Sequence, residues 1–250
     1  MDAIRQRLAG AGIRRPPWLT LTVFLCTAVP SCLQAAVPAI LRDLERTPAG
    51  LTGQWWRSVT SLTVQDGGVL GTLSNLAFLL IIGTIAEQVL TRPRWLALYL
   101  VPGLAGEFVA YGWQPTGAGN SVAVCGLSGA LAVLMLRDRR CAPPVAAYAQ
   151  LMWVGCLVAA ASAIAGGLIF GATGLLLRLS GGRSVSVAGV SVAAVSGEAV
   201  LACGVALAAH QDIHGAALVA GALTLLGRGS SRPGGSRQHR WSCRSSERPC

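Results

Sequence analysis

The chain has 250 residues, of which 53% are hydrophobic and only 12% are charged. A soluble domain carries roughly 25% charged residues because its surface must face water, so this composition excludes an ordinary water-soluble domain and predicts a protein embedded in lipid. The formal net charge of +10 is also typical of proteins that bind nucleic acid. The arginines, however, lie at the ends of apolar stretches and in the two termini, where membrane topology explains them, and we expect no nucleic-acid partner.

The first half of the chain contains four apolar stretches suited to cross a membrane, since roughly 20 apolar residues span the hydrocarbon core as a helix. We expect spans over residues 18–41, 69–90, 95–111 and 121–136. Arginines precede the first stretch, follow the second at 92–94 and follow the fourth at 137–140. By the positive-inside rule, these basic clusters face the cytoplasm, and residues 42–68 and 112–120 face outward.

The second half of the chain is interpreted from its last span. Residues 145–177 and 185–209 are apolar, and the last span runs from His214 to about Leu226. Residues 228–250 are rich in Ser, Gly and Arg without apolar periodicity, which predicts a disordered cytoplasmic tail. For that tail to lie inside, an odd number of spans must separate Arg140 from His214. We expect three, hence eight spans in all, with six as the alternative.

The predicted fold is therefore all-α: a polytopic transmembrane helical bundle of 6–8 spans over residues 18–227. A basic cytoplasmic segment, residues 1–17, precedes it, and the tail follows it. Nothing indicates a metal ion or another cofactor. The 8 cysteines form no CxxC pair, and the pair His210 and His214 lacks a third ligand with suitable spacing. Asp212, between these histidines, is expected to point to another side of the helix.

Polar groups at membrane depth are costly, about 2.5 to 3.5 kcal/mol for a charged one, so each needs a reason. Ser128 stands in a Gly-Leu-Ser-Gly quartet, residues 126–129, which also suits ordinary helix packing. His214 is different, because a lone histidine in a helix rich in Gly and Ala has few structural uses. If the two helices are neighbours, the imidazole can act as general base toward the Ser128 hydroxyl. The side-chain amide of Asn75 is a candidate donor to the oxyanion.

Taken together, these residues resemble the rhomboid intramembrane serine proteases, particularly versions from high-GC bacteria. Four features carry the resemblance, in the order and on the spans that the family uses. They are Trp55-Trp56-Arg57 as the Trp-Arg motif of the first external loop, Asn75 with Glu87 in the second span, Gly126-Leu127-Ser128-Gly129 as the nucleophile motif, and His214 followed by Gly221 in the last core helix. The resemblance covers about residues 18–226, with 145–209 aligning poorly, and implies a six-helix core with one extra helical hairpin.

The resemblance implies a catalytic dyad of Ser128 as nucleophile and His214 as base, acting without a metal ion or cofactor. Asn75, Gly126 and the backbone N–H of Ser128 would form the oxyanion side of the site. The hydrolysed bond would lie in or beside a transmembrane segment of another protein, so the partners would be transmembrane protein substrates and membrane lipid. The expected location is the plasma membrane, with both termini in the cytoplasm.

Three positions depart from the family pattern. Gly71 stands where a histidine commonly precedes the second-span Asn by four residues, and Ala217 replaces the first glycine after the histidine. Ala132 stands where an aromatic residue often follows the serine by four residues. Gly71 and Ala132 motivate an alternative, a rhomboid-like protein that binds transmembrane clients without cleaving them. A small transporter is a further alternative, although the chain shows no inverted repeat.

Overall fold

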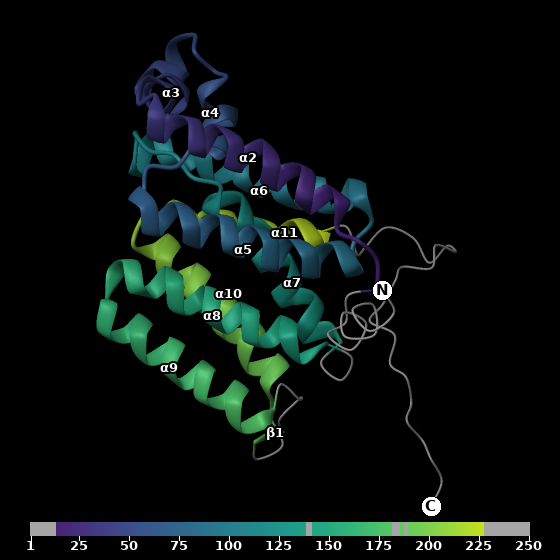
Figure 1. Ribbon diagram of the computed structural model, residues 1–250. Helices are drawn as coiled ribbons and strands as arrows, with labels where there is room; N and C mark the ends of the chain where they lie inside the picture. The colour runs from purple at the N-terminus through teal and green to yellow at the C-terminus, as the bar shows by residue number, and fades with distance from the viewer. Residues whose placement is uncertain (1–13, 139–141, 182–185, 188–189, 228–250) are drawn as a thin grey trace, which may run out of the picture.

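The computed structural model describes residues 14–138, 142–181, 186–187 and 190–227 (Figure 1). The predicted tail over residues 228–250, and all but the last four residues of the predicted N-terminal segment 1–17, lie outside these described residues. Within them the chain is helical, apart from one short antiparallel strand pair. The elements are α2 (Trp18–Ala36), α3 (Ala39–Leu44), η1 (Pro48–Thr52), α4 (Arg57–Thr60), η2 (Ser61–Thr63), α5 (Gly68–Val89), α6 (Arg92–Trp113), α7 (Ser121–Arg137), α8 (Pro144–Ala161), α9 (Ala163–Ser180), β1 (Ser186–Val187), β2 (Val190–Ser191), α10 (Val192–Ala209) and α11 (Ile213–Gly227).

In the described part of the chain, six helices are long and apolar enough to cross a membrane, namely α2, α5, α6, α8, α9 and α10. Helices α7 and α11 are apolar but shorter, with 17 and 15 residues. The predicted all-α polytopic bundle is therefore confirmed. Three helices lie between α7 and α11, in agreement with the odd number that the sequence predicts.

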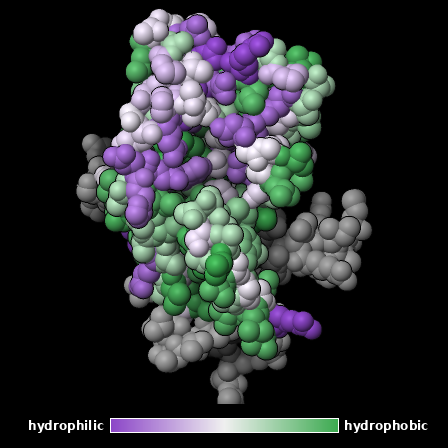
Figure 2. All heavy atoms as spheres, turned by 90° about the vertical axis from the view of Figure 1, so that its left-hand side faces the viewer, coloured by the Kyte–Doolittle hydropathy of each residue, from purple (hydrophilic) through white to green (hydrophobic). Residues whose placement is uncertain are grey.

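The two ends of the bundle differ in character. At one end, here called the loop end, lie the connection over residues 37–67, the α6–α7 loop and the α10–α11 turn. Figure 2 views this end and shows hydrophilic residues gathered over its upper part, at the height of α3 and α4 in Figure 1, with an apolar surface below. The other end, here called the arginine end, carries Arg92 and Arg94 at the start of α6 and Arg137 at the end of α7.

Helix α7 forms the centre of the bundle, and residues 121–133 of it are all buried. It packs against α6, α10 and α11, while α9 lies at the outer edge and packs on α8 (Figure 1). Glycine makes the α7–α11 approach possible, because a Cβ added at Gly129 would clash with the Leu218 carbonyl and one added at Gly221 would clash with the Gly126 carbonyl. Close backbone approach of this kind is the usual source of helix association in lipid.

Ala217, which departs from the family pattern, is accommodated by a neighbouring glycine. A Cβ added at Gly106 on α6 would lie 3.1 Å from the Ala217 Cβ. The additional methyl group on α11 therefore occupies space that α6 leaves open, and the departure does not disturb the packing of the two helices.

Glu87, near the end of α5, fixes the start of α2. Its carboxylate accepts hydrogen bonds from the backbone N–H of Leu19 (3.0 Å) and Thr20 (2.8 Å) and from the Thr20 hydroxyl (2.8 Å). The residue before α2 is Pro17, which supplies no capping side chain, so the first N–H groups of α2 need an outside acceptor. A negative charge at a helix N-terminus is favourable as well. Glu87, first noticed as a family feature, thus has a structural role.

We expect Glu87→Ala to lower the free energy of unfolding by about 2 kcal/mol, because three donors at the start of α2 lose their acceptor. Thermal unfolding in detergent measures this loss. Asp43→Ala is the matched control, because Asp43 is exposed and makes only a 3.8 Å contact with Arg42. Equal melting temperatures for the two variants would contradict the capping role.

Candidate active site

His214 lies in the first turn of α11 at the loop end and contacts two polar side chains. Its Nε2 is 2.9 Å from the hydroxyl oxygen of Ser121, the first residue of α7. Its Nδ1 is 2.7 Å from Oδ1 of Asp212. The structure therefore forms a continuous row of hydrogen-bonding groups, Ser121–His214–Asp212, across the start of two neighbouring helices. Neither Ser121 nor Asp212 was assigned a role from the sequence.

The predicted partner, Ser128, does not meet His214. Its hydroxyl donates to Oε1 of Gln150 on α8 (2.5 Å), and the Gln150 amide donates to the Ser128 carbonyl oxygen (2.9 Å). Both residues are fully buried. Helices α7 and α11 both begin at the loop end, so the first turn of α11 is level with the first turn of α7. Ser128 follows Ser121 by seven residues, about 10.5 Å further along the helix, which is too deep to reach the imidazole.

Gly126, predicted on the oxyanion side of the site, packs between helices instead. A Cβ added there would lie 2.7 Å from both the Leu98 carbonyl oxygen and the Pro102 Cβ of α6. Together with Gly129 it lets α6 and α11 approach α7. Residues 126–129 therefore allow close helix packing around a buried serine, and the oxyanion-side role of Gly126 stays a prediction.

A cavity of about 720 Å³ opens beside Ser121 and His214. Its lining includes Asn75 and Gly71 from α5 and Glu107 from α6. Helix α8, which belongs to the part of the chain that matched the family pattern poorly, contributes Trp153, Cys156 and Leu157. The volume lies in the range of small-molecule and peptide-binding clefts, and Ser128 and Gly126 are not among its lining residues.

Asn75 lies close to Ser121, as its predicted role requires. A Cβ added at Gly119 would lie 3.2 Å from the Ser121 hydroxyl oxygen and 3.5 Å from the Asn75 amide nitrogen, so both groups border the same small space. The Asn75 amide donates to Oε1 of Gln65 (2.8 Å), and the Gln65 amide donates to Oδ1 of Asn120 (2.7 Å). These side-chain bonds hold Asn75 against the loop that precedes Ser121. Gln65 and Asn120 were missed from the sequence, because neither belongs to a motif.

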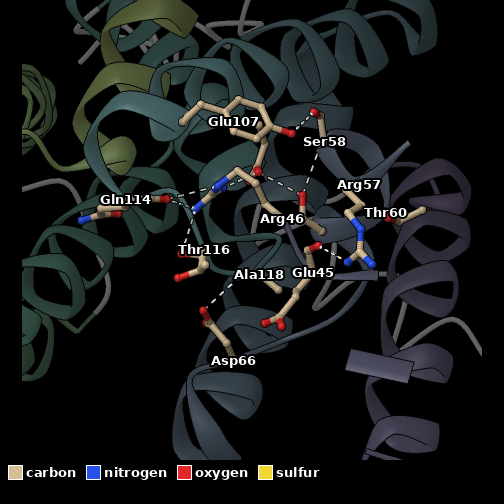
Figure 3. Close-up of polar contacts among 12 residues, drawn as sticks. Glu45, Arg46, Arg57, Ser58, Thr60, Asp66, Glu107, Gln114, Thr116 and Ala118 are labelled. Carbon is tan, nitrogen blue, oxygen red and sulfur yellow. Dashed lines mark hydrogen bonds and ion pairs between the residues drawn. The ribbon is translucent and has the colours of Figure 1, made fainter. Parts of the chain in front are cut away.

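A buried ion pair between Arg46 and Glu107 lies beside this loop (Figure 3). The Arg46 guanidinium also donates to the Gln114 carbonyl (2.8 Å), and the backbone N–H of Arg46 donates to the Gly117 carbonyl (2.9 Å). The Ser61 hydroxyl donates to the Glu107 carboxylate (2.9 Å). The pair thus ties the long loop after α3 and the loop before α7 to α6. A carboxylate at membrane depth is costly without such a partner.

Arg57, in the Trp-Arg motif, holds the same loop from outside. Its guanidinium donates to the carbonyl oxygens of Arg42 and Glu45, each at 2.9 Å (Figure 3). Trp55 and Trp56 are exposed, as suits aromatic rings at a membrane interface. The motif therefore stabilises the loop and does not enter the cavity.

We expect Arg46→Leu and Glu107→Leu each to destabilise the protein by about 3 to 5 kcal/mol, because each leaves an uncompensated buried charge. The double variant Arg46→Leu/Glu107→Leu should lose clearly less than the sum of the two. Unfolding of all four proteins in detergent completes the double-mutant cycle. Additive losses would show that the two side chains do not act as a pair.

Among the described residues, no group of three His, Cys, Asp or Glu side chains is placed to bind a metal ion. The geometry instead joins a serine hydroxyl, an imidazole and a carboxylate. Such an arrangement can support nucleophilic catalysis, in which a base activates a hydroxyl and a third group orients the base.

Comparison with known proteins identifies the family that part of the chain resembles. Residues 52–173 match the family model described as the Rhomboid domain; this segment includes Asn75 and Ser121 but ends before Asp212 and His214. The rhomboid protease GluP of Bacillus subtilis (strain 168) is 32% identical over 93 residues, which cover 35% of this chain and 17% of that protein. No solved structure matches the chain significantly. Residues 52–173 thus match the Rhomboid domain, and they lie within a multi-pass helical bundle.

Proposed function

We propose that the chain is an intramembrane serine endopeptidase in which Ser121 is the nucleophile and His214 its general base. One observation carries the proposal: the 2.9 Å contact between the Ser121 hydroxyl and His214 Nε2 at the wall of a cavity. The same contact argues against the earlier expectation of Ser128, whose hydroxyl is bonded to Gln150 in the buried interior.

In the proposed reaction, the Ser121 oxygen attacks the carbonyl carbon of a peptide bond while Nε2 of His214 takes the hydroxyl proton. The oxyanion that forms would accept hydrogen bonds from the backbone N–H of Ser121, at the N-terminus of α7, and from the Asn75 amide. An amide has two N–H donors, so the bond to Gln65 leaves one for this purpose among the described contacts. His214 then gives its proton to the leaving amine, and water hydrolyses the acyl-enzyme.

Transmembrane segments of other proteins are the substrates that the surroundings of the cavity favour. Leu70 on α5 and Leu157 on α8 both line the cavity, and Leu70 is 83% exposed on the surface of the bundle. Such an apolar edge suits a segment that arrives from lipid. The protease name of the GluP relative supports the same reading, and we extend it to this chain as a proposal.

We further propose that the loop end faces the outside of the plasma membrane and that both termini are cytoplasmic. The support is the charge distribution, since Arg92, Arg94 and Arg137 all lie at the arginine end and positive residues favour the cytoplasmic side. The cleaved bond would then lie in the outer part of the bilayer.

A rhomboid-like protein that binds clients without cleaving them is the second candidate. Gly71 favours it, because this position lines the cavity but offers no side chain to the oxyanion. Counted from Ser121, the position four residues after the serine is Cys125, so Ala132 does not bear on this candidate, although Cys125 is not aromatic either. Ala132 lies instead against α10, where a Cβ added at Gly197 would be 3.1 Å from its carbonyl oxygen.

We expect a fluorophosphonate probe to label the detergent-solubilised wild type but not the Ser121→Ala or His214→Ala variant. Ser128→Ala should still be labelled, with only a loss of stability of about 1 to 2 kcal/mol from the unpaired Gln150. Labelling that survives Ser121→Ala but disappears in Ser128→Ala would overturn the assignment. A folded wild type that is never labelled but binds a transmembrane client would favour the second candidate.

We also expect Gly71→His to raise the rate of cleavage of a transmembrane substrate in liposomes by about tenfold. The position has room, since nothing lies within 4 Å of a Cβ added there, and an additional donor to an oxyanion contributes up to about 10²-fold in kcat. Gly112→His is the control, because Gly112 has equal room but does not line the cavity. An unchanged or lower rate in Gly71→His, with normal folding, would contradict this view of the cavity.

A further inference from the structure

The contact between Asp212 and His214 fixes which ring nitrogen of His214 carries a hydrogen. Oδ1 of Asp212 lies 2.7 Å from Nδ1 of the imidazole. A carboxylate is an acceptor only, so Nδ1 must be the donor. In the neutral ring, Nε2 is then the nitrogen with a free electron pair, and it is the one that faces the Ser121 hydroxyl at 2.9 Å. This is the tautomer that a general base for serine requires.

The chain places Asp212 by two features of the backbone. Helix α10 ends with a pair of hydrogen bonds, Asp212 N–H to the Leu207 carbonyl (2.9 Å) and Gln211 N–H to the Ala208 carbonyl (3.0 Å). This pattern needs a residue in the left-handed region, and Gln211 takes it with φ of 58°, although a side chain there costs about 1 kcal/mol. As a result, Asp212, the residue after Gln211, lies directly before the start of α11.

Asp212 then acts as the N-cap of α11. The Oδ1 atom that contacts the ring also accepts the backbone N–H of His214 at 2.8 Å. One oxygen therefore binds the backbone and the side chain of the same histidine, which restricts both the start of the helix and the rotation of the imidazole. Partial burial acts to raise the pKa of Asp212, but the hydrogen bonds from His214 and its charge hold that pKa below the usual value. Asp212 thus stays ionised where histidine titrates.

Other ionisable groups lie near His214, but none of those in the described residues is bonded to its Nδ1 as Asp212 is. Glu107 on α6 faces the cavity, but its carboxylate is bound by Arg46 and Ser61. Other ionisable side chains near this site in the described residues are Asp66 and Cys156 in the cavity lining, Cys125 on α7 and Cys203 on α10 near Asp212, and His210 in the same turn as Asp212. In the described residues, Asp212 alone among the carboxylates is bonded to the imidazole.

We propose that Asp212 is a positioning residue that completes a Ser121–His214–Asp212 triad, holding the His214 ring in its base tautomer and stabilising the imidazolium that forms. This role rests on the proposed function of Ser121 and His214. The Asp212 and His214 side chains are 29% and 27% exposed, so water screens their attraction, and the contribution to rate should be smaller than in deeply buried triads.

Asp212→Asn tests the proposal, because Asn caps a helix as well as Asp but carries no charge. Using the full chain in liposomes, we expect kcat for a transmembrane substrate to fall about ten- to a hundredfold, with a melting temperature close to that of the wild type. The acidic limb of the pH–rate profile should move to lower pH, because the charge that favours the imidazolium is gone. Asp43→Asn, which removes an exposed carboxylate at the same end of the bundle, should leave the profile in place.

A second measurement does not need activity. In histidine-labelled protein, NMR of the His214 ring, assigned with His214→Gln, should show protonation of the ring at lower pH in Asp212→Asn than in the wild type, because the carboxylate that contacts Nδ1 is gone. If the wild type neither reacts with fluorophosphonate nor cleaves, the proposed function fails, while the titration still decides whether Asp212 acts on the ring.

An unchanged titration and an unchanged pH–rate profile in a folded Asp212→Asn would overturn the positioning role. If Asp212→Asn does not fold, Asp212→Ser replaces it, because serine also caps a helix without a charge. A fall in kcat without any shift of the profile would likewise count against the proposal, since a merely structural loss gives that result.

Discussion

The close approach of α7 and α11 is the contact on which the candidate site depends. Gly129 on α7 and Gly221 on α11 leave no room for side chains between the two backbones. In lipid, where apolar burial between helices is not favoured over contact with lipid tails, such small-residue contacts decide how helices pair. Because both helices begin at the loop end, this pairing sets Ser121 and His214 side by side.

Three sets of polar residues at membrane depth have partners that reduce the cost of their burial. Arg46 and Glu107 pair with each other, Asn75 is bonded through Gln65 to Asn120, and Ser128 is bonded to Gln150. The first two sets join loops to helices around the cavity, so they maintain the shape of the site. The Ser128–Gln150 pair joins α7 to α8 in the interior and belongs to the packing. The partner of a buried polar residue, more than its chemical type, thus distinguishes a structural from a catalytic role.

The helices and their order could be predicted from the sequence because the bilayer itself requires apolar spans and arginines at their cytoplasmic ends, whatever the packing between helices. The nucleophile proposed above could not, because two physical requirements give the same pattern. Glycines beside a serine allow a tight turn at a reactive hydroxyl, and they also allow two helices to approach. Gly126 and Gly129 serve the second purpose. Only the level at which α7 and α11 meet separates Ser128 from Ser121, and that level depends on packing that spans nearly a hundred residues of sequence.

Asp212 was misjudged for a related reason. A helix drawn through residues 210–214 points its side chain away from His214, but α11 begins only at Ile213. The left-handed Gln211 ends α10 and turns Asp212 back toward the helix that follows. Asp212, the N-cap residue, and His214, the second residue of α11, are thereby brought into contact. In the proposed mechanism, Gly71 offers no donor to the oxyanion, whereas the Asp212 carboxylate would hold the base in its reactive tautomer and so stabilise the same transition state from the other side.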